Sequence, residues 1–135
     1  MITSAIEHPA ILNVLNSLKK FGIKTTILKV DKTGILNPDH LKKTIRKNTG
    51  LISIMYANNE TGVIQPLLKL SAIASDHGIP FHSDGVQAIG KIPVDVYENR
   101  VSMMSFSAHK FYGPKGVGAL FIKEDTQLKL SLIHI

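Results

Sequence analysis

One lysine in this chain is placed where an amine could do covalent chemistry. Lys110 lies in the segment SFSAHKFYGPKG, with Phe111 and Tyr112 after it and Ser107 and His109 before it. Surface lysines rarely sit between aromatic residues. In an apolar pocket the pKa of a lysine falls, so that its amine becomes a nucleophile or forms a Schiff base. The pattern therefore predicts a reactive amine.

A second polar cluster, HSDGVQ, places a carboxylate at the end of an apolar stretch. Residues 79–83 are predicted to form a short buried strand, and Asp84 follows directly. A carboxylate in that position is costly unless a cation or a hydrogen-bond donor meets it. Asp84 is equally well explained as the N-cap of a short helix over residues 85–89. The sequence leaves both explanations open.

A third polar segment, NNETG at residues 58–62, follows a strand predicted over residues 51–57. Asn and Gly are the residues that turns use most often. The composition by itself therefore favours a structural turn over a binding loop.

Two common kinds of site do not fit the sequence. GVQAIGK resembles a phosphate-binding P-loop, but Ile92 stands where that motif needs Ser or Thr, and Pro93 prevents a long following helix. The histidines at positions 77, 82 and 109 lack the spacing of paired metal ligands, and the chain has no cysteine. No metal site is predicted.

The polar clusters follow strands in a chain that alternates between helical and strand periodicity. Apolar residues recur at helical spacing in three segments, residues 10–18, 38–47 and 66–76, and β-type runs cover residues 1–4, 25–30, 51–57, 79–83, 101–106 and 116–122. This alternation predicts one α/β unit with a mostly parallel sheet flanked by helices. Such sheets bind ligands at the carboxyl ends of their strands.

Both ends of the chain are expected to be incomplete. Residues 1–4 are predicted to form a strand that has no earlier element to pair with. Residues 130–135, LSLIHI, resemble the translation of an end sequence used in preparing DNA libraries, although a genuine terminal strand is the alternative. We therefore expect residues 1–129 to be a fragment of a larger domain and residues 130–135 to be a non-native tail.

Composition indicates a soluble globular protein. The 135 residues are 44% hydrophobic and 19% charged, and no apolar run approaches the roughly 18 residues of a membrane helix. The net charge is +6, but the basic residues are dispersed and only 6% of residues are aromatic, which favours a solvated surface over nucleic-acid binding. The absence of cysteine fits a reducing compartment, and a cytoplasmic location is expected.

Four motifs, in this order, carry a family resemblance: TSAIEHPA, NNETGVIQP, PFHSDGVQAIGK and MMSFSAHKFYGPKGVGALFI. They resemble the cysteine desulfurases, which are pyridoxal-phosphate enzymes of fold type I in the class V aminotransferase group. The resemblance runs from about residue 2 to residue 124. It implies that the chain is the central part of the large cofactor-binding domain of such an enzyme.

The resemblance also implies roles for individual residues. Lys110 matches the lysine that binds the cofactor covalently and later moves protons. Asp84 matches the carboxylate that pairs with the pyridinium nitrogen, and His8 matches the histidine that stacks on the ring and takes part in proton transfer. Four further matches are cofactor contacts, two to the ring oxygen and two to the phosphate: Asn59 and Gln87, then Ser107 and His109.

The implied reaction converts L-cysteine to L-alanine and passes the sulfur, as a persulfide, to acceptors such as an iron–sulfur scaffold protein and to tRNA thiolation. The implied enzyme is a cytoplasmic homodimer that contacts neither nucleic acid nor membrane directly. The acceptor cysteine of the family is absent here. We therefore expect a fragment that is inactive alone and that aggregates or binds the cofactor poorly. Selenocysteine lyase, another class V aminotransferase and a non-catalytic remnant are the alternatives.

Overall fold

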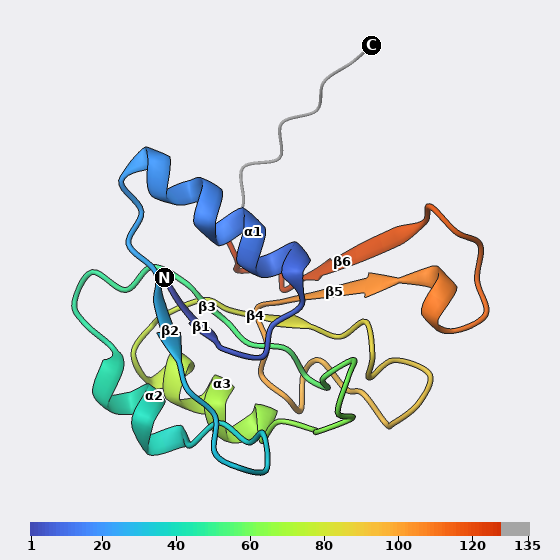
Figure 1. The fold of residues 1–135 in the computed structure, drawn as a ribbon, viewed down its shortest axis with the longest axis horizontal. Helices are drawn as coiled ribbons and strands as arrows, with labels where there is room; N and C mark the ends of the chain where they lie inside the picture. Colours follow the sequence, from blue (N-terminus) through green and yellow to red (C-terminus); the bar gives the residue numbers. More distant parts are fainter. Residues whose placement is uncertain (128–135) are drawn as a thin grey trace.

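The computed structural model describes residues 1–127, so the expected tail at residues 130–135 lies outside the described part of the chain. Its core is one six-stranded sheet with the order β2-β1-β3-β4-β5-β6 (Figure 1). The strands are β1 (Ile2–Ser4), β2 (Thr26–Leu28), β3 (Ile52–Ser53), β4 (Phe81–Asp84), β5 (Met103–Ser107) and β6 (Gly118–Ile122). Strands β1 to β5 are parallel to one another, and β6 runs antiparallel to β5. The predicted, mostly parallel α/β sheet is confirmed.

Helices cover both faces of this sheet. They are α1 (Pro9–Leu18), α2 (Pro38–Thr44) and α3 (Leu67–Asp76), with short 3-10 turns η1 (Lys19–Phe21) and η2 (Ala108–Lys110). Figure 1 shows α1 on one side of the sheet and α2 and α3 on the other. The hairpin of β5 and β6 extends beyond the helices, so its outer end is not covered by them.

The helix starts follow the capping chemistry in the sequence. The side chain of Asn37 accepts a hydrogen bond from the backbone N–H of Asp39 at 2.8 Å, and proline occupies the first position of α2. The predicted helix over residues 38–47 ends earlier, at Thr44, because Ile45 adopts an extended conformation with ψ of 135°. All three predicted helices are present, and the last differs from its prediction by one residue at its start.

The main core lies between the sheet and the α2/α3 layer. Ile2, Ile52 and Phe81 occupy one register row across β1, β3 and β4, and all three are buried. They pack with buried leucines from the two helices, including Leu41 of α2 and Leu70 of α3. Burying this apolar row against the helices fixes which residues of each strand face the opposite side, under α1.

The strand order reverses at β1. The chain passes from β1 to β2 on one side and later returns to add β3 on the other side of β1. The opening strand, expected to lack an earlier partner, is therefore held between two later strands. In parallel sheets the crevice at such a reversal, outside the carboxyl ends of the strands, is where ligands bind.

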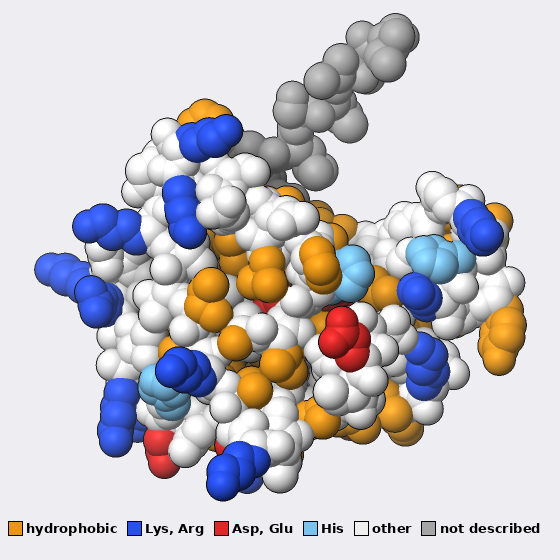
Figure 2. Space-filling model, viewed as in Figure 1, with side chains coloured by type: hydrophobic (Ala, Val, Ile, Leu, Met, Phe, Trp, Pro, Cys, Tyr) orange, Lys and Arg blue, Asp and Glu red, His pale blue; other side chains and the backbone are white. Residues whose placement is uncertain are grey.

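Figure 2 shows Lys and Arg side chains mostly along the outer edge of this face, with hydrophobic side chains nearer its centre. Within residues 1–127, no helix combines the length and apolar character needed to cross a membrane.

Candidate active site at the carboxyl edge of the sheet

The residues expected to do chemistry all follow strand ends on one edge of the sheet. His8 follows β1, Asn59 follows β3, Asp84 ends β4, and Lys110 ends the η2 turn that follows β5. Because these four strands are parallel, their carboxyl ends share one edge. The fold therefore gathers on one edge residues that are up to 102 positions apart in the sequence, from position 8 to position 110.

Asp84 and the segment that carries Lys110 are joined through paired strands. Asp84 lies opposite Ser105 in the β4–β5 register, and the backbone N–H of Gly85 donates to the carbonyl of Ser105 at 3.0 Å. Lys110 follows Ser105 by five positions. This pairing fixes the direction in which each loop leaves the sheet.

Asp84 also shows the capping geometry that the sequence left open. Its Oδ1 accepts a hydrogen bond from the backbone N–H of Val86 at 2.9 Å, and the N–H groups of Ala88 and Ile89 donate to the carbonyl of Gly85. The segment forms turns instead of a regular helix. Among residues 1–127, the second carboxylate oxygen of Asp84 has no hydrogen-bond partner, so capping leaves half of the carboxylate available.

The surroundings of Lys110 differ from the predicted apolar pocket. Lys110 is exposed, Phe111 is 37% exposed, and Tyr112 is completely exposed. The described residues therefore do not enclose the amine. The reason is its position at the outer end of the β5–β6 hairpin, beyond the cover of the three helices (Figure 1).

Two expected phosphate ligands contact each other. The Oγ of Ser107 lies 2.9 Å from Nδ1 of His109, at the start of the η2 turn. The two residues expected to contact the ring oxygen, Asn59 and Gln87, do not contact each other in this way. Gln87 accepts a hydrogen bond from the amine of Lys91 through Oε1, and Asn59 is exposed.

His8 is the N-cap of α1. Its Nδ1 accepts a hydrogen bond from the backbone N–H of Ala10 at 3.1 Å, and the imidazole is exposed. An acceptor at Nδ1 places the ring hydrogen of the neutral imidazole on Nε2. The cap thus fixes both the position of the ring and its tautomer.

Sequence reasoning missed two buried residues beside these groups. Glu7 is 5% exposed, and its Oε1 accepts hydrogen bonds from Oγ of Ser4 at 2.6 Å and from the backbone N–H of Met55 at 2.9 Å. Burial raises the pKa of Glu7 to about 7, with a smaller contribution from the charge of Asp84. The sequence signal was a carboxylate directly before His8.

Asn58 is the second residue for which the sequence suggested no role of its own, although the loop that contains it was correctly predicted to be a turn. Its Oδ1 accepts from the backbone N–H groups of Glu60 and Thr61 at 3.0 and 2.8 Å. Its Nδ2 donates to the carbonyl of Ile6 at 2.9 Å. Asn58 therefore shapes the loop that carries Asn59 and ties it to the loop that carries His8.

A polar row lies beneath the edge on the α1 face of the sheet. Thr3, Ser53 and His82 are register neighbours, and Oγ of Ser53 lies 2.8 Å from Nδ1 of His82. Burial lowers the pKa of His82, while the charge of Asp84, two residues further along β4, acts in the opposite direction. Burial thus favours the uncharged form of this imidazole, which lies in the polar row of the sheet. No cluster of three metal-binding side chains occurs within residues 1–127.

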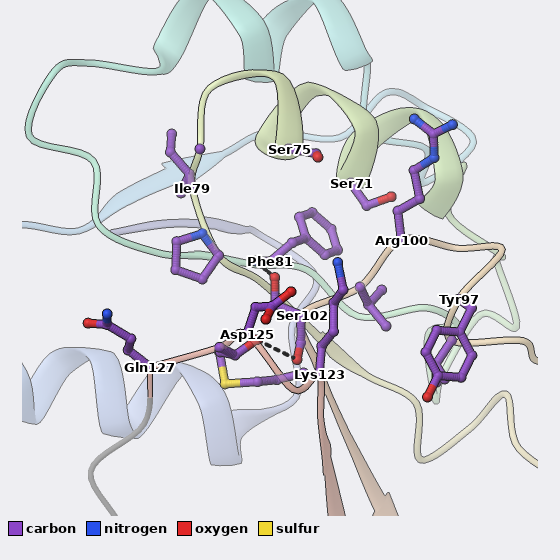
Figure 3. Close-up of a pocket in the computed structure, with 16 residues that line it drawn as sticks. Ser71, Ser75, Ile79, Phe81, Tyr97, Arg100, Ser102, Lys123, Asp125 and Gln127 are labelled. Atoms are coloured by element: carbon purple, nitrogen blue, oxygen red, sulfur yellow. Dashed lines mark hydrogen bonds between the residues drawn. The ribbon is translucent and has the colours of Figure 1, made fainter.

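A pocket lies at the opposite edge of the sheet. It has a volume of about 830 Å³ and is lined by residues that precede β4 and β5 and follow β6, among them Ile79, Val101 and Lys123. Figure 3 shows Arg100, Lys123, Phe81 and Ser102 among the side chains that line it. None of the expected site residues lines this pocket.

Comparisons with known proteins identify the family of this chain. The family described as aminotransferase class V matches residues 1–134. A cysteine desulfurase, IscS, from Dictyoglomus turgidum is 54% identical over 134 residues, which are 99% of this chain and 34% of that protein. The mitochondrial cysteine desulfurase of Arabidopsis thaliana is 46% identical over 130 residues, or 96% of this chain and 29% of that protein. The chain thus spans about a third of the length of the curated relatives it matches.

Solved structures give the same result for the fold. The structure "SspA in complex with cysteine" superposes with a TM-score of 0.93 at 40% identity, covering 98% of this chain and 39% of that one. A NifS-like protein superposes with a TM-score of 0.93 at 41% identity, covering 98% and 37%. These matches confirm the expected fold type I architecture. The chain therefore belongs to the class V aminotransferase family, and within that family it is similar to cysteine desulfurases.

Proposed function

We propose that the full-length protein containing this chain is a pyridoxal-phosphate-dependent cysteine desulfurase. The proposed reaction converts L-cysteine to L-alanine and transfers the sulfur to a cysteine acceptor as a persulfide. One observation carries the proposal: Asp84 and the Lys110 segment leave the carboxyl edge from two paired strands, β4 and β5. An amine and a carboxylate on adjacent strand ends are the two groups that pyridoxal phosphate requires most.

The donors and acceptors at this edge fit that cofactor. The free oxygen of Asp84 suits a protonated ring nitrogen, the exposed amine of Lys110 suits a covalent link, and a hydroxyl beside an imidazole at Ser107 and His109 suits a phosphate. When bound, pyridoxal phosphate would supply an electron sink for the substrate carbon.

Each remaining role belongs to a residue of this chain. Asp84 would keep the ring nitrogen protonated, and Lys110 would carry protons to and from the substrate carbon after releasing the cofactor. His8 would cover the ring face with its Nε2 hydrogen available for donation. Asn59 and Gln87 would contact the ring oxygen, and for Gln87 this requires its amide to exchange its contact with Lys91.

The sulfur acceptor of the proposed reaction is not within these 135 residues, because they contain no cysteine. The substrate class is supported by the names of the relatives and by a similar protein whose structure was determined in complex with cysteine. Iron–sulfur scaffold proteins are the partners we propose for the persulfide.

We also propose a homodimer in the cytoplasm. The absence of cysteine in this segment is typical of proteins in reducing compartments. Exposed apolar side chains on the β5–β6 hairpin, including Val117 at 53% and Leu120 at 45%, support burial against further protein.

Borohydride reduction tests the central assignment. The full-length protein is incubated with pyridoxal phosphate, reduced, digested and mapped by mass spectrometry, with Lys110→Ala beside it. We expect the reduced cofactor on Lys110 and none in the variant. Lys115→Ala, which removes the other lysine of the same loop, is the matched control and should label normally. A label on another lysine contradicts the assignment.

Substrate specificity is tested by product analysis. We expect alanine and reducible sulfur from L-cysteine in equal amounts. Alanine from L-selenocysteine without turnover of L-cysteine would instead identify a selenocysteine lyase.

A further inference from the structure

The β1–α1 loop, which carries His8, is fastened to the neighbouring β3 segment by one buried carboxylate. β1 ends at Ser4 and the helix begins at Pro9, so the intervening residues cross the point at which the strand order reverses. The chain segments that follow β1 and β3 therefore lie next to each other at this point. The side chain of Glu7 joins these two segments.

The side chain of Glu7 supplies a hydrogen-bond acceptor to β3 where β1 no longer offers a backbone carbonyl. The backbone N–H groups of Ile54 and Tyr56 donate to the carbonyls of His82 and Asp84 in β4, so the N–H of Met55 points the other way, toward β1. β1 has already ended at that level. Oε1 of Glu7 accepts the hydrogen bond of Met55 at 2.9 Å, in place of a strand carbonyl.

A second contact joins the same two segments. Nδ2 of Asn58 donates to the carbonyl of Ile6 at 2.9 Å, one residue before Glu7. The residue directly after Glu7 is His8, whose imidazole is placed by the N-cap of α1. The loop is therefore fixed on one side by residues 55 and 58 and on the other by the start of the helix.

The remaining oxygen of Glu7 is buried and has no hydrogen-bond partner within the described chain. A buried polar group that is only half satisfied costs free energy, and the bridge from Glu7 to Met55 is kept at that cost. The carboxyl of Glu7 is connected to the candidate site in three ways. It precedes His8 in the sequence, it accepts the hydrogen bond of Met55, and the charge of Asp84 acts on its pKa.

Resting on the proposed function, we propose that Glu7 is a positioning residue that holds His8 over the cofactor ring by joining the loop that carries His8 to the β3 segment. Glu7 itself does not touch the substrate. Its carboxyl holds the backbone next to His8 through the hydrogen bond to Met55, while the N-cap contact with Ala10 orients the imidazole.

The test compares Glu7→Ala, which removes the bridge, with Glu7→Gln, which keeps an acceptor oxygen at the same distance. Glu98→Gln, an exposed carboxylate whose side chain makes no hydrogen bond in residues 1–127, is the control. All variants are made in the full-length protein. If Glu7→Ala does not fold, Glu7→Asp replaces it, because its carboxylate is one methylene too short to reach Met55.

Two readouts are used. The first is hydrogen–deuterium exchange of the peptides that cover residues 5–8 and 54–58, which does not depend on the cofactor. The second is the visible circular dichroism of the bound cofactor, together with kcat for L-cysteine. We expect Glu7→Ala to raise exchange in both peptides about tenfold and to lower kcat about 10- to 100-fold with a changed dichroism band. Glu7→Gln should restore all three to within about twofold of the unaltered protein.

Two results would overturn the proposal. Faster exchange in Glu7→Ala with unchanged dichroism and kcat would show that Glu7 only stabilises the fold, and unchanged exchange would show that Glu7 does not hold the loop. Failure of the proposed function is seen separately, as absence of reduced cofactor on Lys110 in the unaltered protein.

Discussion

Gly90 and Phe111 are in close contact across the two loops that carry Asp84 and Lys110. A Cβ placed on Gly90 would lie 2.9 Å from Cβ of Phe111, and Gly90 has a φ of +75°. The glycine therefore allows both a left-handed turn after Asp84 and the approach of the loop after Lys110. The distance between the carboxylate and the amine depends on this contact as well as on the paired strands.

Replacing Gly90 with alanine should therefore disturb the site in addition to the fold. We expect Gly90→Ala to lower the free energy of unfolding by about 1–3 kcal/mol, from backbone strain and the clash with Phe111. Cofactor labelling of Lys110 should slow as well. Gly22→Ala is the matched control: its φ is +78°, but a Cβ there meets nothing within 4 Å. Equal effects of the two variants on labelling would contradict the prediction. Urea unfolding and borohydride labelling measure the two effects.

Asp84→Asn should separate the two roles of Asp84. The Asn side chain keeps an oxygen that can accept from Val86, so the turn should persist, while the negative charge is lost. We expect normal labelling of Lys110 and a kcat lower by about 10²- to 10³-fold. Asp95→Asn removes the charge of a similar turn, where Asp95 accepts from Tyr97 and Glu98, and should leave kcat unchanged. Steady-state kinetics with L-cysteine measure kcat for both variants. A small effect of Asp84→Asn on kcat would contradict the prediction.

The free energy of unfolding should depend on pH through Glu7. Burial raises the pKa of Glu7 from its ordinary value of 4.5 to about 7, so the folded state holds the proton more tightly than the unfolded state. The contribution of the protonated Glu7 to the free energy of unfolding is therefore fully present below about pH 4.5 and is lost as the pH rises through about 7. The stability of the unaltered protein relative to Glu7→Gln should fall by an amount on the order of 3 kcal/mol over this interval. Urea unfolding at several pH values measures it, and parallel pH profiles of the two proteins would contradict it.

Asn58→Ala should loosen two loops together. The variant leaves the N–H groups of Glu60 and Thr61 and the carbonyl of Ile6 without their partner. We expect a loss of about 2–4 kcal/mol in the free energy of unfolding, because several buried or half-buried groups lose hydrogen bonds at once. Asn59→Ala, at the exposed neighbouring position, should cost less than about 0.5 kcal/mol. Comparable losses in the two variants would show that Asn58 is not the organising residue. Thermal unfolding of the full-length protein makes the comparison.

Much of the fold could be predicted from the sequence because its signals are local. Asn37 before Pro38 marked the start of α2, and alternation of apolar runs with helical stripes indicated the parallel sheet. Strand limits were less accurate. The predicted strand over residues 51–57 forms a regular ladder only at Ile52–Ser53, because β1 ends early and a side chain takes over the contact to Met55.

The sequence motifs name the expected site residues Lys110, Asp84 and His8, whose roles stay predictions. The residues that support them have no such motif: the contact of Glu7 with Met55 joins residues 48 positions apart and has no local signature. The exposure of Phe111 and Tyr112 was also not predictable, because neighbouring aromatic residues in the sequence do not fix which way their side chains point.

The position of β1 in the sheet also has a consequence for synthesis on the ribosome. β1 can pair with β2 as soon as residues 26–28 emerge, whereas its other side must wait for residues 52–53. Every later strand then adds beside the one made just before it. Among the six described strands, none has to be inserted between two that are already paired. Until β3 is made, one edge of β1 stays unpaired in the nascent chain, and the bridge from Glu7 to Met55 then extends the contact between the two segments beyond the end of β1.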